Sequence, residues 1–315
     1  MKILVTPTSL KEDSPLEAMQ ILREYTDDLV FNPYGRPLTE EELLPLLQDC
    51  DGYIAGLDWI TGKALAGAKR LKVISRYGVG YDRVDMPEAK KRNITVTNTP
   101  GVNSRAVAEL TFGLILSLVR KIPWLNEKTG SGQWVRYSGA ELNGKILGVV
   151  GLGAIGRIVA QYGKAFGMTV LAYDPYIDKD YCEKENFEVS GLSTLLARAD
   201  VITLHVPLLP ETRHMINEDA LARMKQGAFL VNTARGGLID EEAAALALES
   251  GKLRGLGLDA FEQEPPQKSP LFGRDDVVLT PHAGAHTKEA VEKMAMLSVE
   301  NLIQVLEKKP CKYIL

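Results

Sequence analysis

A glycine-rich turn between two short apolar runs is the feature that most constrains the fold of this chain. Residues 145–150 have the composition of a buried strand, and residues 168–173 have that of a second strand. Between them, Gly151-Leu-Gly153-Ala-Ile-Gly156 opens an amphipathic helix, so the stretch predicts a βαβ unit. Gly151 allows the sharp bend, Gly153 lets a pyrophosphate approach the backbone, and Gly156 lets the helix pack close to the strand.

The carboxylate that ends the second strand turns this unit into a predicted dinucleotide site. Asp174 lies about 20 residues beyond the glycines, the spacing of the acid that accepts hydrogen bonds from an adenosine ribose. The pyrophosphate would bind the exposed N–H groups at the N-terminus of the helix. A carboxylate at 174 would repel the 2′-phosphate of NADP, and residues 175–177 contain no Arg or Lys, so we expect NAD. The alternative is a strand-to-helix turn that binds nothing.

Composition and charge limit the remaining classes of function. The 315 residues suffice for about two domains, and the net charge of −4, without any cluster of Lys and Arg, argues against a nucleic-acid partner. Cys50, Cys182 and Cys311 are scattered, so we expect no metal site and a reducing, cytoplasmic setting. The longest apolar stretch, 106–119, contains Glu109 and is shorter than the ~20 residues that span a bilayer, so we expect no membrane span.

Short strands alternate with helices in two blocks along the chain. This alternation predicts an α/β protein with parallel sheets covered by helices. After the last strand, a helical pattern over 289–307 is expected to cross back and pack on the N-terminal block. The predicted strands are 1–7, 29–31, 51–56, 71–75 and 94–97 in the first block, and 145–150, 168–173, 201–206, 228–232, 255–259 and 277–280 in the second.

Two segments between the blocks are less defined. Pro100-Gly101 ends the first block, and Asn103 or Ser104 can cap the helix predicted over 106–119. The apolar stripe of this helix either belongs to the core or contacts a second subunit in part. Residues 123–143 carry two tryptophans among polar and glycine residues, and we expect an extended excursion without a regular element.

Polar residues follow three strands of the second block, where ligands of open α/β sheets bind. They include Arg235, Glu264 and His282. A guanidinium can hold a carboxylate bidentately and polarise the adjacent carbonyl. An imidazolium can give the proton that the carbonyl oxygen takes as hydride arrives at carbon, and a carboxylate on its other nitrogen fixes the tautomer. This set is what the reduction of a 2-keto acid by a nicotinamide requires.

Six motifs in this order make the chain similar to the D-isomer-specific 2-hydroxyacid dehydrogenase family, in the style of phosphoglycerate dehydrogenases. The resemblance implies two Rossmann-like domains with a cleft between them: a doubly wound, parallel-sheet NAD-binding domain over 100–286, and a smaller flavodoxin-like substrate domain over 1–99 and 287–315. It also implies a homodimer formed largely by the cofactor domains. The motifs are Arg76-Tyr-Gly-Val-Gly-Tyr-Asp, Gly151-Leu-Gly-Ala-Ile-Gly, His205-Val-Pro-Leu, Asn232-Thr-Ala-Arg-Gly-Gly, Asp259-Ala-Phe-Glu-Gln-Glu-Pro and Thr280-Pro-His-Ala-Gly.

The resemblance also assigns residues position by position. Arg235 matches the substrate-binding arginine, Glu264 the acid that supports the histidine, and His282 the proton donor; these three are the expected catalytic residues. The backbone of Gly78 and Val79, with Arg235 and His282, matches the substrate contacts. The expected cofactor contacts are Gly151, Gly153, Ala154, Ile155, Gly156, Asp174, His205, Pro207, Thr233, Ala234, Arg235, Asp259, His282, Gly284 and Ala285.

Several alternatives remain open at this point. Glu262 competes with Glu264, and the spacing before Pro265 favours Glu264. His286 competes with His282, and the family pattern selects the histidine that follows Pro281, which is His282. Family members that act on phosphoglycerate often carry arginines where this chain has Asp58, which puts 3-phosphoglycerate in doubt.

The expected activity is the NAD-dependent interconversion of a D-2-hydroxyacid and its 2-keto acid in the cytoplasm. One alternative is a glyoxylate or hydroxypyruvate reductase that uses NADPH. A second, of a different class, is an NAD(H)-sensing, corepressor-like binding protein without turnover. The particular 2-hydroxyacid and the physiological direction do not follow from the residues.

Overall fold

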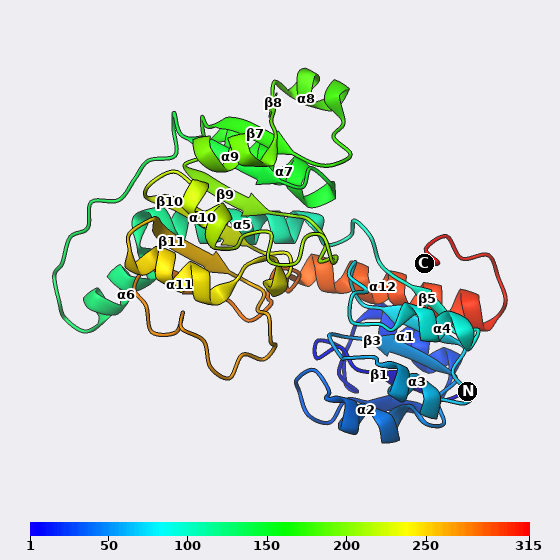
Figure 1. Ribbon diagram of the computed structural model, residues 1–315. Coiled ribbons are helices and arrows are strands. Elements are labelled where there is room, and N and C mark those ends of the chain that lie inside the picture. The colour runs from blue at the N-terminus through cyan, green and yellow to red at the C-terminus, as the bar shows by residue number, and fades with distance from the viewer. The chain divides into compact units, whose positions relative to one another are not determined.

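The chain forms two compact units in the computed structural model, which describes residues 1–315. Unit 1 consists of Met1–Asn103 and His286–Leu315, and unit 2 of Ser104–Ala285 (Figure 1). Each unit has one parallel sheet with helices on both faces, so the predicted α/β class with two Rossmann-like sheets is confirmed.

The sheet of unit 1 has five parallel strands in the order β2-β1-β3-β4-β5, the flavodoxin-like order. One apolar cluster joins the sheet to α2, α3 and α4, and a second joins its opposite face to α1 and α12. The elements are β1 (Ile3–Val5), α1 (Glu17–Tyr25), β2 (Leu29–Phe31), α2 (Glu40–Leu47), β3 (Gly52–Ala55), α3 (Gly62–Gly67), β4 (Val73–Arg76), α4 (Met86–Lys91), β5 (Thr95–Thr97) and α12 (Lys288–Leu306).

Helix α12 packs on the N-terminal sheet, as its pattern predicted. Its residues Ala295, Val299 and Leu302 are fully buried, and it contacts α1, β3 and β4. Gly52 of β3 is close to this helix, because a Cβ there would lie 3.2 Å from Leu302 Cδ1. The unit is therefore built from both ends of the chain.

The sheet of unit 2 has seven parallel strands in the order β12-β11-β10-β9-β6-β7-β8. Counted from β6, this is the doubly wound order 3-2-1-4-5-6 with one further strand. Helices α5 and α7 belong to the apolar cluster of one face, and α9, α10 and α11 to that of the other. The elements are α5 (Ser104–Arg120), α6 (Ile122–Gly130), β6 (Ile146–Val150), α7 (Ala154–Ala165), β7 (Thr169–Tyr173), α8 (Lys179–Glu185), β8 (Glu188–Val189), α9 (Leu192–Arg198), β9 (Val201–Leu204), α10 (Glu218–Arg223), β10 (Ala228–Asn232), a 3₁₀ turn (Gly236–Leu238), α11 (Glu241–Glu249), β11 (Leu253–Leu258) and β12 (Val277–Leu279).

The expectation for residues 123–143 was wrong in its first part, where the chain forms α6. Lys121 adopts a left-handed conformation (φ 49°) that turns the chain out of α5, and Pro123 occupies the first turn of α6, where a missing N–H is tolerated. The helix buries none of its residues, so it has no apolar stripe by which a sequence pattern could reveal it. Residues 131–143 contain no helix or strand and form a long extended segment at the edge of unit 2 (Figure 1).

The start of α5 also differs from the expectation. Ser104 is the first helical residue, and Asn103 precedes it in the position of an N-cap. The buried Oδ1 of Asn103 nevertheless makes no hydrogen bond, so the side chain does not cap the helix.

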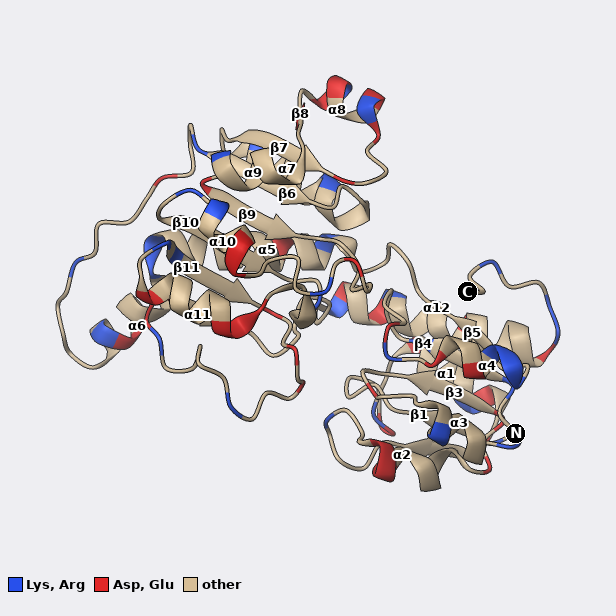
Figure 2. Ribbon diagram, viewed as in Figure 1, with Lys and Arg blue, Asp and Glu red and all other residues tan.

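Acidic and basic residues are interspersed on the helices and loops of each unit, as Figure 2 shows. No helix combines the length and apolarity needed to cross a bilayer.

Candidate active site

The glycine turn after β6 has the conformation that its residues predicted. Gly151 has φ +96°, and a Cβ on it would lie 2.6 Å from the carbonyl oxygen of His205. A Cβ on Gly156 would lie 1.9 Å from the carbonyl oxygen of Gly151, so only glycine allows α7 to begin this close to the turn. At Gly153, by contrast, a Cβ would meet nothing within 4 Å. Open space therefore lies beside the N-terminus of α7, where Ala154 and Ile155 begin the helix.

Asp174 lies directly after β7 and holds the turn. Its Oδ2 accepts a hydrogen bond from the Leu152 N–H at 2.8 Å, and its Oδ1 accepts one from the Tyr176 N–H at 2.8 Å. Each carboxylate oxygen has a second lone pair, so the acid can also accept from a hydroxyl. The open helix N-terminus and the acid beside it fit a dinucleotide, with the pyrophosphate at Gly153 and a ribose at Asp174.

The loop after β9 forms the other side of the point where the strand order reverses, between β6 and β9. His205 lies in this loop, and its N–H donates to the Val150 carbonyl oxygen at 2.7 Å. Burial lowers the pKa of the His205 ring to about 3, so the ring is neutral at physiological pH. Its Nε2 lies 2.9 Å from Thr203 Oγ1, and its buried Nδ1 has no partner. The Pro207 carbonyl oxygen accepts a hydrogen bond from Thr212 Oγ1 at 2.7 Å.

The turn after β10 is shaped by a side chain that the sequence reasoning did not single out. Asn232 is fully buried, its Nδ2 donates to the Arg235 carbonyl oxygen at 2.8 Å, and its Oδ1 accepts from the Ala234 N–H at 3.0 Å. Thr233 Oγ1 lies 2.8 Å from Thr111 Oγ1 of α5. Arg235 has an extended backbone, and its Nη1 donates to the Ala234 carbonyl oxygen.

Asp259, at the end of β11, anchors the loop that carries the predicted proton donor. It is 2% exposed, and it accepts hydrogen bonds from Thr280 Oγ1 at 2.6 Å, the Ala283 N–H at 2.7 Å and the Gly284 N–H at 2.8 Å. Burial raises the pKa of this carboxyl group, and the three hydrogen bonds oppose that rise. Its carboxylate oxygens are thus already used within the loop that ends at Ala285, and its role as a cofactor contact stays a prediction.

Glu264 and His282 form a close pair. His282 Nδ1 lies 2.9 Å from Glu264 Oε1 and 3.0 Å from Oε2, and Oε1 also accepts from the Phe261 N–H at 3.0 Å. The Glu264 side chain is 8% exposed and that of His282 is 24% exposed, so the acid is enclosed while the ring reaches the surface. Nδ1 is engaged by the acid, which leaves Nε2 as the nitrogen that can donate outward. Glu262 has other partners, Arg213 and His214.

Unit 1 contains a turn with two of the residues expected to contact the substrate. Gly78 has φ +139°, its N–H donates to Thr99 Oγ1 at 2.9 Å, and its carbonyl oxygen accepts from the Thr99 N–H at 3.0 Å. The Val79 carbonyl oxygen accepts from Asn98 Nδ2 at 2.9 Å, and its side chain is 40% exposed. The Gly78 N–H is therefore already hydrogen-bonded to Thr99 within unit 1, a contact that the sequence motif did not predict.

Asp58 requires a correction of the substrate argument. The sequence placed this acid where it would oppose a substrate phosphate, but the side chain is fully buried. Its Oδ1 accepts from the Leu38 N–H at 2.7 Å, and its Oδ2 accepts from Tyr53 Oη at 2.8 Å and from Thr6 Oγ1. A carboxylate with these partners holds two loops of unit 1 together and does not face a ligand. The acid itself therefore does not repel a substrate phosphate, while the doubt about 3-phosphoglycerate that rests on the missing arginines stays a prediction.

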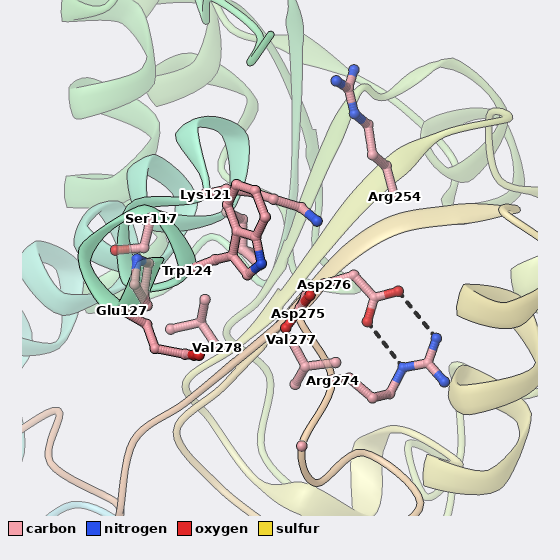
Figure 3. Close-up of a pocket in the computed structure, with 13 residues that line it drawn as sticks. Ser117, Lys121, Trp124, Glu127, Arg254, Arg274, Asp275, Asp276, Val277 and Val278 are labelled. Carbon is pink, nitrogen blue, oxygen red and sulfur yellow. Dashed lines mark hydrogen bonds and ion pairs between the residues drawn. The ribbon is translucent and has the colours of Figure 1, made fainter. Parts of the chain in front are cut away.

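A cavity of about 240 Å³ lies elsewhere in unit 2, between the helices α5 and α6 and the edge strand β12. Figure 3 shows Trp124 and Lys121 on one side of it, and Arg274 paired with Asp276 on the other. None of the predicted catalytic or cofactor residues lines this cavity. The buried Nε1 of Trp124 has no hydrogen-bond partner.

Residues 112–284 match the family model described as "D-isomer specific 2-hydroxyacid dehydrogenase, NAD binding domain". A glyoxylate reductase of Thermofilum pendens is 43% identical over 304 residues, which cover 93% of this chain and 89% of that protein. The chain belongs to this family. Its unit 2 is thus the NAD-binding domain of a D-2-hydroxyacid dehydrogenase family member.

Two further relatives of this family member are informative. A D-3-phosphoglycerate dehydrogenase of Methanocaldococcus jannaschii is 45% identical over 310 residues, which cover 97% of this chain but only 57% of that protein. The chain thus spans little more than half the length of this relative. The crystal structure of D-lactate dehydrogenase from Aquifex aeolicus, complexed with NAD and lactic acid, matches with a TM-score of 0.82 and 34% identity over 98% of this chain and 96% of that one.

Proposed function

We propose that the protein is an NAD-dependent dehydrogenase that interconverts a D-2-hydroxyacid and its 2-keto acid. The observation that carries this proposal is the Glu264–His282 pair, with Nδ1 held at 2.9 Å from an enclosed carboxylate, in the NAD-binding unit of this family. A protein that only senses NAD(H) has no need of an oriented imidazole whose second nitrogen can donate a proton.

The proposed roles follow from the chemistry of the side chains. Arg235 binds the substrate carboxylate bidentately and polarises the adjacent carbonyl group. His282 donates a proton from Nε2 to the carbonyl oxygen in the direction of reduction and takes it back in oxidation. Glu264 accepts the proton of Nδ1, which leaves Nε2 to donate from the imidazolium or to accept in the neutral ring, and its negative charge stabilises the imidazolium. The nicotinamide, when bound, supplies or accepts the hydride. The contribution of Gly78 and Val79 to carboxylate binding stays a prediction.

The substrate belongs to the small 2-keto acids, and we propose that hydroxypyruvate, glyoxylate and phosphohydroxypyruvate are the compounds to compare. Relatives that are 45% and 43% identical are called D-3-phosphoglycerate dehydrogenase and glyoxylate reductase, respectively. Because the Asp58 carboxylate is buried and bonded, no acid at this position opposes a phosphate group, and the phosphorylated substrate is again a candidate.

The test is the loss of NADH absorbance on this panel, with wild type and His282→Ala side by side. We expect turnover of at least one 2-keto acid by the wild type, and a decrease in kcat of about 10²- to 10⁴-fold in the variant, the usual contribution of general acid–base catalysis. NADH binding, followed by protein fluorescence, should remain. Wild-type protein that binds NADH but reduces no 2-keto acid would support the sensing protein instead, and a variant with normal turnover would remove His282 from the mechanism.

We also propose that the enzyme is a homodimer in which unit 2 contributes α6 and the segment 131–143. Trp134 is 84% exposed, and Ile122 and Val135 are 50% and 37% exposed, an apolar surface that a second copy could cover. The cavity beside Trp124 adjoins this region.

The proposed location is the cytoplasm. Cys50, Cys182 and Cys311 are all free thiols, and burial raises the pKa of the Cys50 thiol to about 11 and raises that of Cys182 as well. Free thiols persist in a reducing compartment. If cell fractionation finds the protein in the extracellular or envelope fraction, the proposed location is wrong.

A further inference from the structure

Glu262 lies two residues before the predicted catalytic acid and has a set of contacts of its own. Its Oε1 accepts a hydrogen bond from Arg213 Nη2 and lies 3.2 Å from His214 Nε2. Its backbone N–H donates to Glu241 Oε1 of α11 at 3.1 Å. The segment that carries Glu264 is therefore held from two directions, by the loop after β9 and by α11.

The same loop is bonded to the backbone that follows Arg235. The His214 N–H donates to the Gly237 carbonyl oxygen at 2.8 Å, and the Ile216 N–H donates to the Leu238 carbonyl oxygen at 3.0 Å. His214 has φ +48°, a left-handed conformation that non-glycine residues rarely adopt, so the loop is tightly shaped at this point. Arg213 and His214 thus connect the turn of Arg235 to the segment of Glu264.

The two segments also touch directly. A Cβ on Gly236 would lie 1.8 Å from the carbonyl carbon of Phe261 and 2.2 Å from the backbone nitrogen of Glu262, so their backbones are in contact. The Phe261 N–H in turn donates to Glu264 Oε1, the oxygen that lies 2.9 Å from His282 Nδ1. A displacement of residues 261–262 is therefore passed on to the carboxylate that orients His282.

We propose that Glu262, held by Arg213 and His214, is a positioning residue that fixes Glu264 relative to Arg235. This inference rests on the proposed function. Arg213 and Glu262 have side chains that are 55% and 37% exposed, and an exposed ion pair contributes little to stability. The cluster of Arg213, Glu262 and His214 is thus expected to act on the geometry of the catalytic groups rather than on the melting temperature.

The test compares Glu262→Ala with Glu188→Ala, a matched control in the same unit. Glu188 pairs with Arg198, and the two side chains are 44% and 42% exposed. For Glu262→Ala we expect kcat to fall about tenfold, less than the ~100-fold loss that a 1 Å misplacement of reacting groups causes. The KM for NADH and the melting temperature should stay unchanged, and Glu188→Ala should have no effect. Glu262→Gln keeps an oxygen acceptor for Arg213 and should recover part of the loss.

A second comparison separates positioning from a general structural effect. In a Glu264→Ala background, the Glu262→Ala substitution should cause almost no further decrease in kcat, because the group that it positions is already missing. A full and additive loss in this background, or a wild-type kcat in Glu262→Ala alone, would overturn the proposal.

A third measurement does not depend on turnover. Amide hydrogen exchange of residues 260–264 should be faster in Glu262→Ala than in wild type, and unchanged in Glu188→Ala. If the exchange of these amides is the same in Glu262→Ala as in wild type, the positioning role is wrong, even when the wild-type enzyme turns over a 2-keto acid. Wild-type protein that turns over no 2-keto acid would instead contradict the proposed function, whatever the exchange result.

Discussion

Two glycines of the turn after β6 allow the packing role and the cofactor role to be separated by single alanine substitutions. At Gly156 the added Cβ would lie 1.9 Å from the Gly151 carbonyl oxygen and 3.3 Å from Val149 Cγ1. At Gly153 the added Cβ would meet nothing within 4 Å. The first substitution therefore acts on the fold of unit 2, and the second acts only on a group that binds at the N-terminus of α7.

The size of each effect follows from these distances. An ordinary contact of about 3.4 Å at Gly156 requires α7 to move by about 1.5 Å, and overpacking this severe lies at the upper end of the usual cost, about 3 kcal/mol. Because alanine favours the helix by about 1 kcal/mol over glycine, we expect a net loss of about 2 kcal/mol in the free energy of unfolding. For a unit of this length that lowers Tm by about 4–8 °C. At Gly153, the entropy gain of about 0.4–1 kcal/mol is offset by the loss of a favourable glycine N-cap, so Tm should hardly change.

Calorimetry of the free protein and titration with NADH measure the two effects separately. We expect Gly153→Ala to keep its Tm within about 2 °C but to weaken NADH binding by at least tenfold, about 1.4 kcal/mol, because the methyl group occupies the space of the pyrophosphate. Gly156→Ala should have both a lower Tm and a lower affinity for NADH. Wild-type NADH affinity in Gly153→Ala would refute the placement of the pyrophosphate, and a wild-type Tm in Gly156→Ala would refute the packing argument.

Two further predictions concern unit 1 and the subunit contact. Asp58→Ala should lower the free energy of unfolding by about 2–4 kcal/mol, because the Leu38 N–H and the Tyr53 hydroxyl lose their buried acceptor. Asp58→Asn should lower it by about half as much. Equal urea midpoints for wild type and Asp58→Ala would contradict this prediction. The wild-type protein should sediment with the mass of two chains, and Trp134→Ser should weaken this dimer because Trp134 is exposed in the single chain. Wild-type protein that sediments as a monomer at micromolar concentration would contradict the proposed subunit contact.

The sheets and the glycine turn could be predicted because their signals are local. The strands of a covered parallel sheet are short apolar runs, and Val149 and Val150 of β6 are fully buried as such a run requires. The turn at Gly151 and the acid at Asp174 are recognised by spacing alone, because the βαβ unit fixes their separation. The return of α12 to unit 1 was also predictable, since a long amphipathic helix needs a sheet to cover.

Other features depend on contacts between residues far apart in the chain, and spacing does not reveal them. The partners of Asp58 lie at Thr6 and Leu38, so its burial could not be predicted from the residues that surround it. Helix α6 packs no apolar face against a core, and the pattern by which helices are recognised is therefore missing from it. The Gly78 amide is occupied by Thr99, a contact between two turns that neither turn indicates.

The acids at the strand ends show why motif residues of this kind serve more than the ligand. Asp174 accepts from the Leu152 N–H, Asp259 from the Ala283 and Gly284 N–H groups, and Asp58 from the Leu38 N–H, so each carboxylate fixes the backbone of a neighbouring loop. Loops that are fixed before a ligand binds need no reorganisation during the reaction. A substitution at Asp174 or Asp259 therefore changes the shape of the site as well as its charge.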